Sequence, residues 1–212
     1  MKNIPVFTTE NGVGAIILQE IPYSANAYVR IHDSAAPSEF IQECAQFCNA
    51  AGAQRGYATG HAALEGYPLH TVLVQMQCLR SSLPETDACL FPVTEATIDL
   101  WRDLYNKKMS GVPNAAWMTA TDGQKMLSDA EGYFVHRNGQ LLGIGRVTDG
   151  TLAVVASCIP GGGREVVCAL SHGLCGETVS LEVALENKKA VTLYQKLGFV
   201  TVKEISRWYQ IL

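Results

Sequence analysis

The segment 187–199 constrains the fold of this chain more than any other part of the sequence. It opens at Asn187, a residue type that favours a helix N-cap, and it closes at a glycine suited to the position after a helix. A strand-like run, 179–184, precedes it. The spacing predicts a short helix with Asn187 and Tyr194 two turns apart on nearly one face and Ala190 between them. A Tyr hydroxyl held there can donate a proton to a leaving group, although an amphipathic helix with a capping Asn and a core Tyr has the same pattern.

Composition and charge narrow the class of protein. The chain has 212 residues, of which 48% are hydrophobic and 17% charged, so one large or two small domains with a sizeable core are expected. The net charge is −4 and the sequence pI about 5.7, which favours neither nucleic acid nor an anionic membrane as a partner. There is no signal-peptide pattern and no apolar run of membrane-spanning length. A cytoplasmic protein is therefore predicted, and a homodimer stays open.

The cysteines indicate reduced thiols. There are seven, mostly inside apolar runs, and none forms a CxxC pair. Cys44 and Cys48 share a helix face and have the chemistry of metal ligands, but no His-rich cluster lies near them in the sequence. The sequence therefore predicts no metal site.

Two halves are expected from the pattern of elements. Residues 1–82 predict a small α/β unit, with a helix that starts at Pro37, and the polar segment 81–87 predicts a linker. Residues 88–212 predict a second domain with element order αα-ββ-β-α-β-α-ββ from Thr94, which is expected to cap the first helix. The last two strands are expected near 199–204 and 206–211.

A glycine-rich turn lies between the apolar run 151–159 and the next predicted helix. Its three glycines, Gly161, Gly162 and Gly163, allow backbone N–H groups to approach a ligand, and the helix that follows presents free N–H groups and a positive dipole end. Three consecutive glycines where one would serve favour a cradle for a pyrophosphate over the alternative, a flexible strand-to-helix turn. A Walker loop is excluded because no Lys-Ser/Thr follows. A dinucleotide fold remains an alternative, with Glu182 at a suitable distance but Val166 in place of the third glycine.

Taken together, these elements resemble the GNAT superfamily of acetyltransferases over about 120 residues from Thr94. The acyl-CoA loop of that family reads Gln/Arg-x-x-Gly-x-Gly/Ala, and here Cys158 stands where Gln or Arg is usual. A later motif, Asn-x-x-Ala-x-x-Leu-Tyr-x-x-x-Gly-Phe, is matched at every defined position by Asn187, Ala190, Leu193, Tyr194, Gly198 and Phe199. The resemblance implies an α/β (α+β) fold, a mixed, mostly antiparallel twisted sheet flanked by helices. The first half would then be an added α/β unit, or a degenerate copy of the same fold.

The resemblance also implies a reaction and a site. Acetyl-CoA would be the co-substrate, a small amine or a peptide the acceptor, and Tyr194 the acid that protonates the departing thiolate. The residues implied to bind the co-substrate are Val155, Ala156, Ser157 and Cys158 along the pantetheine arm, Gly161, Gly162, Gly163, Arg164 and Glu165 at the pyrophosphate, and Asn187, Ala190 and Tyr194 on the helix. A non-catalytic acyl-CoA-binding or sensing module is the alternative, favoured by Cys158 and by the lack of an evident general base.

Candidates for the general base and for the acceptor pocket stay open. Glu182 and His136 are the first candidates for the base, with Ser157 and Asp149 behind them. In the first half, His61, Glu65 and His70 form either a polar surface loop or part of an acceptor pocket. The aromatic pair Trp208 and Tyr209 would line the same pocket or belong to the core.

Overall fold

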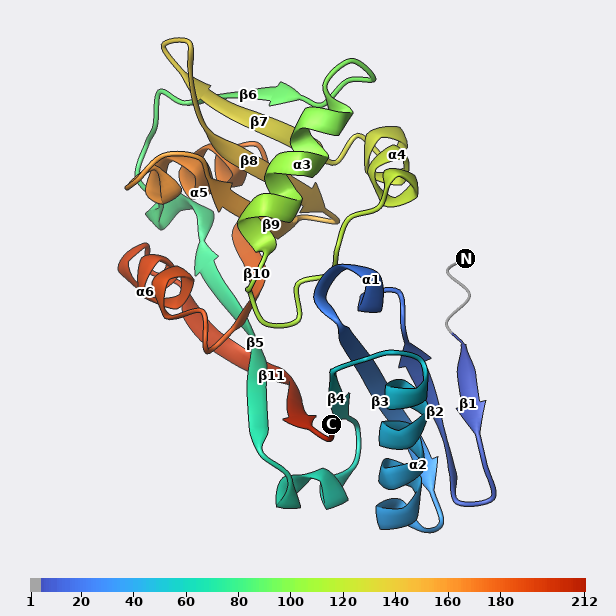
Figure 1. Cartoon of the computed structure of the whole chain (residues 1–212). Coiled ribbons are helices and arrows are strands. Elements are labelled where there is room, and N and C mark those ends of the chain that lie inside the picture. Colours follow the sequence, from blue (N-terminus) through green and yellow to red (C-terminus); the bar gives the residue numbers. More distant parts are fainter. Residues whose placement is uncertain (1–4) are drawn as a thin grey trace. The chain divides into compact units, whose positions relative to one another are not determined.

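The chain, described here from a computed structural model for residues 5–212, folds into two compact units. Unit 1 consists of the described residues up to Leu73 together with Ile205–Leu212, and unit 2 is Val74–Glu204. The chain passes from unit 1 to unit 2 within strand β5 (Leu69–Leu79) and returns within β11 (Val200–Gln210) (Figure 1). No helix among residues 5–212 is long and apolar enough to cross a lipid bilayer.

The segment 81–87, expected to be a linker, lies within unit 2. The Thr86 hydroxyl donates a hydrogen bond of 2.6 Å to the Glu165 carboxylate. The Asp87 carboxylate lies 3.6 Å from the guanidinium of Arg137. The polar residues that give this segment the composition of a linker therefore bind it to the rest of unit 2.

Unit 1 is a sheet with one long helix. Its strands are β1 (Val6–Thr8), β2 (Gly12–Ile17), β3 (Asn26–Ser34), β4 (Arg55–Thr59) and the end of β11, in the order β1-β2-β3-β4-β11. Its helices are α1 (Ile21–Ser24), α2 (Pro37–Ala50) and the 3-10 turn η1 (Ala62–Gly66). The strands β3 and β4 are parallel and joined by α2, whereas the other described pairs in this unit are antiparallel.

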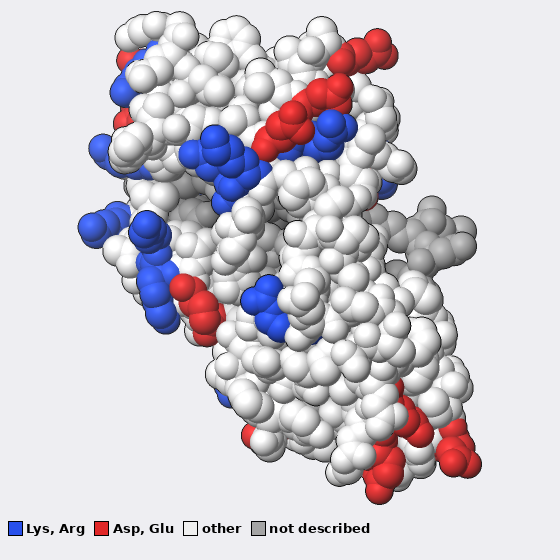
Figure 2. All heavy atoms as spheres, in the orientation of Figure 1, with Lys and Arg blue, Asp and Glu red and all other residues white. Residues whose placement is uncertain are grey.

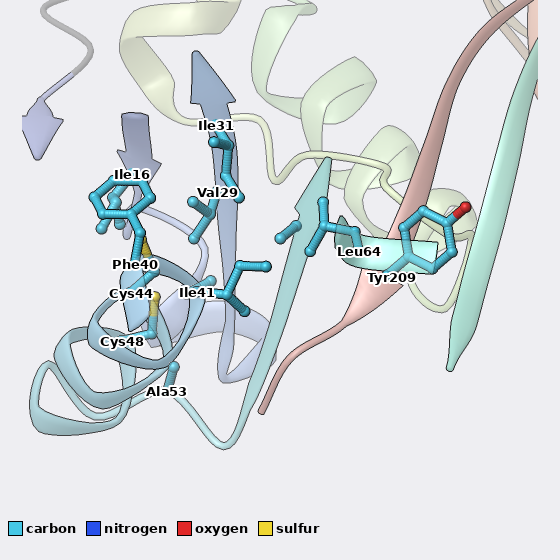
Figure 3. Close-up of a cluster of buried hydrophobic side chains, with 12 residues drawn as sticks. Ile16, Val29, Ile31, Phe40, Ile41, Cys44, Cys48, Ala53, Leu64 and Tyr209 are labelled. Atoms are coloured by element: carbon cyan, nitrogen blue, oxygen red, sulfur yellow. The ribbon is translucent and has the colours of Figure 1, made fainter. Parts of the chain in front are cut away.

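The core of unit 1 lies between α2 and its sheet (Figure 3). Helix α2 begins at Pro37, as predicted, and buries the side chains Phe40, Ile41, Cys44 and Cys48 at helical spacing. These side chains pack in one cluster with Ile16 of β2 and with Val29 and Ile31 of β3. Each large apolar side chain buried here contributes roughly 1.5–3 kcal/mol of transfer free energy.

Unit 2 is a sheet with helices on both faces. Its strands follow the order β5-β10-β9-β8-β7-β6. They are, besides β5, the strands β6 (Cys89–Pro92), β7 (Gly132–Arg137), β8 (Gln140–Thr148), β9 (Thr151–Ser157) and β10 (Thr178–Ala184). The helices are α3 (Ile98–Met109), α4 (Ala120–Ser128), α5 (Gly163–His172), α6 (Lys188–Lys196) and the 3-10 turn η2 (Arg80–Ser82). The predicted mixed, mostly antiparallel sheet flanked by helices is confirmed.

The two faces of the unit 2 sheet are used differently. On one face Trp101 of α3 and Met126 of α4 pack with Ile144 of β8 in a buried cluster. On the other face α5 lies close against β8 because β8 carries glycines there. A Cβ added at Gly145 would stand 2.2 Å from a methyl carbon of Leu170. This close packing fixes the position of α5, and with it the glycine turn at the start of the helix.

Two details differ from the sequence prediction. Helix α3 begins at Ile98 with Thr97 at the N-cap, because Thr94 starts a turn that places its N–H on the Thr97 hydroxyl at 3.0 Å. The two closing strands predicted near 199–204 and 206–211 are one continuous strand, β11. The sequence contains no Gly or Pro between them to break the extended backbone.

The start of α4 offers a test of local stability. Thr119 caps this helix by accepting a hydrogen bond from the Asp122 N–H, and the Asp122 side chain accepts one from the Thr119 N–H in return. We expect Thr119→Ala to lower the free energy of unfolding by about 1 kcal/mol, because the Asp122 N–H at the helix end loses the hydroxyl that accepts its hydrogen bond. Urea unfolding measures this change. Thr121→Ala, an exposed substitution inside the same helix, is the control, and an equal loss in both variants would contradict the capping role.

Candidate functional site

The parallel strands β9 and β10 separate soon after they begin. Their Cα partners are Ser180↔Thr151 and Leu181↔Leu152, and the register extends no further. On its other side β9 stays paired with β8 as far as Gly143↔Ser157. The residues 153–157 of β9 therefore have one row of backbone N–H and C=O groups without a partner in β10. Such a row can bind an extended ligand that carries amide groups of its own.

Unit 1 has the same succession of elements without this opening. Its β1-β2-β3-α2-β4 order matches β7-β8-β9-α5-β10 in the direction of every described strand pair. The pair β3–β4, however, stays in register from Asn26↔Arg55 to Arg30↔Thr59. The turn before α2 also lacks glycines, with Ala35 and Ala36 in their place. Unit 1 therefore lacks both features that make unit 2 a candidate binding site.

The glycine turn continues directly from the unpaired part of β9. The Cys158 N–H donates to the Leu142 carbonyl at 2.7 Å, and the Ser157 hydroxyl donates to the Ile159 carbonyl at 2.5 Å. Gly161 has a φ of +77°, a conformation that favours glycine, and no atom lies within 4 Å of where its Cβ would be. The turn is therefore held at its base and open at its tip.

Helix α5 starts where the turn ends. Its first N–H groups, those of Gly163, Arg164 and Glu165, have no carbonyl partner within the helix and sit at its positive dipole end. A Cβ at Gly163 would stand 2.9 Å from a methyl carbon of Leu193, so α6 packs against the start of α5 at this glycine. The absence of a side chain at Gly163 therefore brings the start of α5 and the middle of α6 together.

Helix α6 confirms the prediction for its segment. The side-chain oxygen Oδ1 of Asn187 caps the helix by accepting a hydrogen bond from the Ala190 N–H at 3.3 Å. The side-chain nitrogen of Asn187 makes no hydrogen bond to the described residues. Tyr194 is buried, with its ring centroid 5.7 Å from that of Phe199. Burial raises the pKa of the Tyr194 hydroxyl to about 12, so the hydroxyl keeps its proton at neutral pH. The geometry gives Tyr194 a core position and a proton that it can donate.

Positive charge gathers near the glycine turn. Burial raises the pKa of the Cys158 thiol, and the charge of Lys108, at the end of α3, opposes that shift, which places Lys108 close to the turn. The exposed face of α3 changes from acidic at its start (Asp99) to basic at its end (Lys107, Lys108), and further basic side chains cover α6 (Figure 2). Lys108 is a residue that sequence reasoning missed, because fifty positions separate it from Cys158.

The side chains of Arg164 and Glu165, also predicted to bind the co-substrate, have different surroundings. Arg164 is exposed at the first turn of α5, where its charge can reach an anion. The Glu165 side chain, in contrast, accepts the Thr86 hydrogen bond and lies 3.7 Å from Arg137, so only its backbone N–H remains for a ligand. Ala190 follows Asn187 by one helical turn, as the sequence predicted.

The two first candidates for a general base lie on different strands. Glu182 is exposed on β10, just past the last residue that pairs with β9. His136 lies on β7, which β8 separates from β9, with its ring 5.2 Å from that of Phe91. Of the two, Glu182 is the one that lies beside the opening between β9 and β10.

The polar residues of the first half have different local roles. His61 caps the turn η1 by accepting from the Ala63 N–H at 3.1 Å, and Glu65 is exposed. His70 stacks on Tyr57 with ring centroids 3.8 Å apart. Of the aromatic pair near the C-terminus, Tyr209 packs in the core cluster under α2, and Trp208 is equally buried but lies outside that cluster, with its ring against Tyr28.

The candidate metal ligands of the sequence were Cys44 and Cys48. Among residues 5–212 no group of three or more His, Cys, Asp or Glu side chains is arranged to hold a metal ion. Burial raises the pKa of the Cys44 thiol to about 12 and that of Cys48 to about 11, so both stay protonated and are poor ligands. These two cysteines serve the core of unit 1.

Comparison with known proteins identifies the fold. No protein-family profile and no curated protein matches the sequence. Solved structures do match. A conserved protein of unknown function from Staphylococcus epidermidis is 13% identical, with a TM-score of 0.61 over 99% of this chain and 94% of its own. A putative acetyltransferase from Pyrococcus horikoshii is 12% identical (TM-score 0.59; 93% and 68% covered), and a GCN5-related N-acetyltransferase from Sphaerobacter thermophilus is 13% identical (TM-score 0.54; 94% and 76%). The fold is therefore that of the GCN5-related N-acetyltransferases, as the resemblance implied.

Proposed function

We propose that this protein is an N-acetyltransferase that uses acetyl-CoA as acetyl donor and an amine as acceptor. The observation that carries the proposal is the continuous path in unit 2 from the unpaired edge of β9, through the glycine turn, to the first N–H groups of α5. Coenzyme A is an extended chain with two amides and a pyrophosphate, and this path presents amide partners followed by an anion site. The fold likeness to named acetyltransferases supports the same assignment.

The residues along the path fit the co-substrate. The free edge of β9 at residues 155–157 borders the opening where the pantetheine amides would pair, whereas the Cys158 N–H already has the Leu142 carbonyl as its partner. The backbone N–H groups from Gly161 to Glu165 would hold the pyrophosphate, with Arg164 and Lys108 adding positive charge. Cys158 stands where the family motif has Gln or Arg. Lys108 supplies, near Cys158, the positive charge that an Arg in place of Cys158 would have supplied.

The bound co-substrate supplies an activated thioester carbonyl and a thiolate leaving group. The chain positions that carbonyl for attack by the lone pair of a neutral amine, which forms the C–N bond as the C–S bond breaks. The Tyr194 hydroxyl donates its proton to the departing sulfur and is reprotonated from solvent. The amine loses its extra proton to water or to Glu182, the carboxylate beside the opening.

A non-catalytic acyl-CoA-binding module is the second candidate. The observation that favours it is the burial of Tyr194, whose hydroxyl makes no hydrogen bond to the described residues and whose surroundings raise its pKa to about 12. A tyrosine in that setting also fits a purely structural role against Phe199. Both candidates share the acyl-CoA site and differ in whether Tyr194 takes part in chemistry.

Thermal melting with saturating ligand tests the shared part of the proposal. Binding at a hundred times the dissociation constant adds about 2.7 kcal/mol to stability, which is a readily measured rise in Tm. We expect acetyl-CoA and CoA to raise the Tm and NADH and NADPH to leave it unchanged. A rise with the dinucleotides alone would overturn the acyl-CoA assignment in favour of the dinucleotide alternative.

Lys108 gives a graded prediction for the same site. We expect Lys108→Gln to weaken acetyl-CoA binding about twofold to fivefold, since a partly exposed charge near an anion contributes about 0.5–1 kcal/mol. Added salt should reduce the difference between the wild-type and the variant dissociation constants, measured by titration calorimetry. Lys107→Gln, the exposed neighbour on α3, is the control. Equal losses in the two variants would show that only the general charge of the helix matters.

A further inference from the structure

A cavity of about 530 Å³ lies in unit 2 beside the C-terminal end of α5. Its lining residues come from the segments 79–85 and 172–177, and we call it the α5-end cavity. The side chains of Leu79, Glu85 and Glu177 in this lining are exposed, so the cavity is open to solvent. Pockets that bind small molecules have volumes of about 300–1,000 Å³, and the α5-end cavity is therefore large enough for a free amino acid.

Three hydrogen bonds hold the two walls of the cavity together. The Arg80 backbone N–H donates to the Glu177 carbonyl at 2.7 Å, and the Arg80 guanidinium donates to the Leu174 carbonyl. The Nε2 atom of His172 lies 3.1 Å from the Pro84 carbonyl, and Nε2 is the donor because a carbonyl oxygen only accepts. Both walls belong to unit 2, so the cavity is formed before any ligand enters it.

The α5-end cavity and the glycine turn lie at opposite ends of α5. The helix has 10 residues, from Gly163 beside the turn to His172 in the cavity lining, and is about 15 Å long at a rise of about 1.5 Å per residue. A ligand in the cavity is therefore bound apart from the turn to which the pyrophosphate of acetyl-CoA is assigned.

The lining of the cavity carries charges of both signs. Glu85 and Glu177 each bring a carboxylate that makes no hydrogen bond or ion pair with the described residues. Arg80 brings one positive charge, and its Nε and Nη2 atoms make no hydrogen bond within the described part of the chain. Leu79 and Leu83 add apolar surface between these groups. The cavity therefore presents two groups that attract cations, one that attracts an anion, and a surface for an aliphatic chain.

We propose that the α5-end cavity binds a basic α-amino acid. The α-carboxylate binds at Arg80, the two ammonium groups bind at Glu85 and Glu177, and the aliphatic chain covers the leucines of the lining. A simple amine brings no anion for Arg80, and a simple carboxylate is repelled by the two glutamates. A basic α-amino acid, with two positive charges and one negative charge, gives each charged group of the lining a partner of opposite sign.

Saturation-transfer NMR titration with L-lysine, in the absence of acetyl-CoA, tests the proposal. Three analogues each lack one of the charged groups of lysine: L-norleucine lacks the side-chain ammonium, 6-aminohexanoate the α-ammonium, and cadaverine the carboxylate. We expect the dissociation constant of L-lysine to be lower than that of each analogue by about threefold or more, the effect of one solvent-exposed ion pair.

Two variants locate the bound lysine. Glu85→Gln and Glu177→Gln keep the size of the side chain and remove one carboxylate charge, so each should weaken L-lysine binding about threefold or more. Each should also lose the preference for lysine over one of the two analogues that lack an ammonium group. Glu95→Gln is the matched control, because Glu95 is an exposed carboxylate of the same unit outside the cavity lining. It should leave the dissociation constant unchanged.

The outcomes do not depend on whether the protein is an acetyltransferase. Equal binding of lysine and the three analogues, or no saturable binding at millimolar concentration, would overturn the amino-acid site. Selective binding that survives both substitutions would place lysine elsewhere and overturn the proposal as well. Circular dichroism confirms that each variant is folded, and Leu79→Ser, an exposed position in the lining, replaces a variant that unfolds. Selective binding that the cavity variants weaken and the control retains supports the site, even if acetyl-CoA fails to raise the Tm.

Discussion

Replacing Tyr194 by Phe is expected to lower the rate of acetyl transfer by about two to four orders of magnitude and to leave acetyl-CoA binding unchanged. The ring of Tyr194 packs against Phe199, and a Phe ring fills the same space. The hydroxyl makes no hydrogen bond to the described residues, so its removal leaves no protein group without a partner. The substitution therefore removes the proposed proton donor and little else.

Two measurements on the Tyr194→Phe variant distinguish the candidates. Steady-state kinetics gives kcat, and the Tm rise with acetyl-CoA reports binding. Tyr133→Phe is the control, because its hydroxyl donates to the Ala130 carbonyl on the exposed side of unit 2. An unchanged kcat in the Tyr194 variant would contradict the role of proton donor. If wild-type protein binds acetyl-CoA and acetylates no amine, the non-catalytic module becomes the better assignment.

The pH dependence of kcat follows from the environment of Tyr194. Burial raises the pKa of its hydroxyl to about 12, above the ordinary value of 10.0, so the protonated form that donates persists as the pH rises. We expect no fall in kcat from deprotonation of Tyr194 below about pH 10. The prediction would be contradicted if kcat of the wild-type protein fell with rising pH already below about pH 10 and the Tyr194→Phe variant showed no such fall.

Replacing Gly162 by Val is expected to weaken acetyl-CoA binding by about tenfold or more. A Cβ at this position would stand 2.8 Å from a side-chain carbon of Ile159 and 2.9 Å from the Ser157 hydroxyl. Either the turn must open or Ile159 must move, and both displace the N–H groups at the start of α5. The expected loss is in binding, because the substitution touches the turn and leaves Tyr194 in place.

Calorimetric titration of the Gly162→Val variant at low temperature measures this loss while the variant is folded. Gly66→Val is the matched control, since no atom lies within 4 Å of its Cβ position and it belongs to unit 1. Gly161→Ala is a milder companion, because a φ of +77° strains any residue with a Cβ even though the space around it is open. Unaltered binding in the Gly162→Val variant would show that acetyl-CoA does not use the glycine turn.

Local patterns predicted much of the fold correctly. The helix after Asn187 forms where the cap and the glycine place it, α2 starts at Pro37, and the hairpin β7–β8 turns at Asn138 and Gly139. Each of these depends on residues within a few positions of one another. The turn at Thr94–Thr97 was missed because two threonines in one segment are equally suited to cap a helix, and packing of Ile98 selects the second.

The division of the chain into units 1 and 2 could not be predicted from composition. The segment 81–87 is polar and contains Pro, yet a hydrogen bond from Thr86 to Glu165 holds it in unit 2. The last residues of the chain belong to unit 1 because Tyr209 pairs with Ala58 and packs in that core. Both facts rest on partners about eighty or more positions away, which no local pattern records.

The sequence by itself determined the glycine turn, the helix that follows it, and the capped helix that carries Asn187 and Tyr194, because caps, glycines and helical spacing act over a few residues. The tertiary structure decided how these elements are placed. It ends the pairing of β9 with β10 after Leu152, and it places Lys108 near enough to Cys158 for its charge to oppose the rise in the pKa of that thiol. It also buries Tyr194 and gathers Tyr28, Tyr57 and Trp208 on one face. These features arise from packing between segments distant in the chain, where burial and strand register, rather than local propensity, set the positions of the side chains.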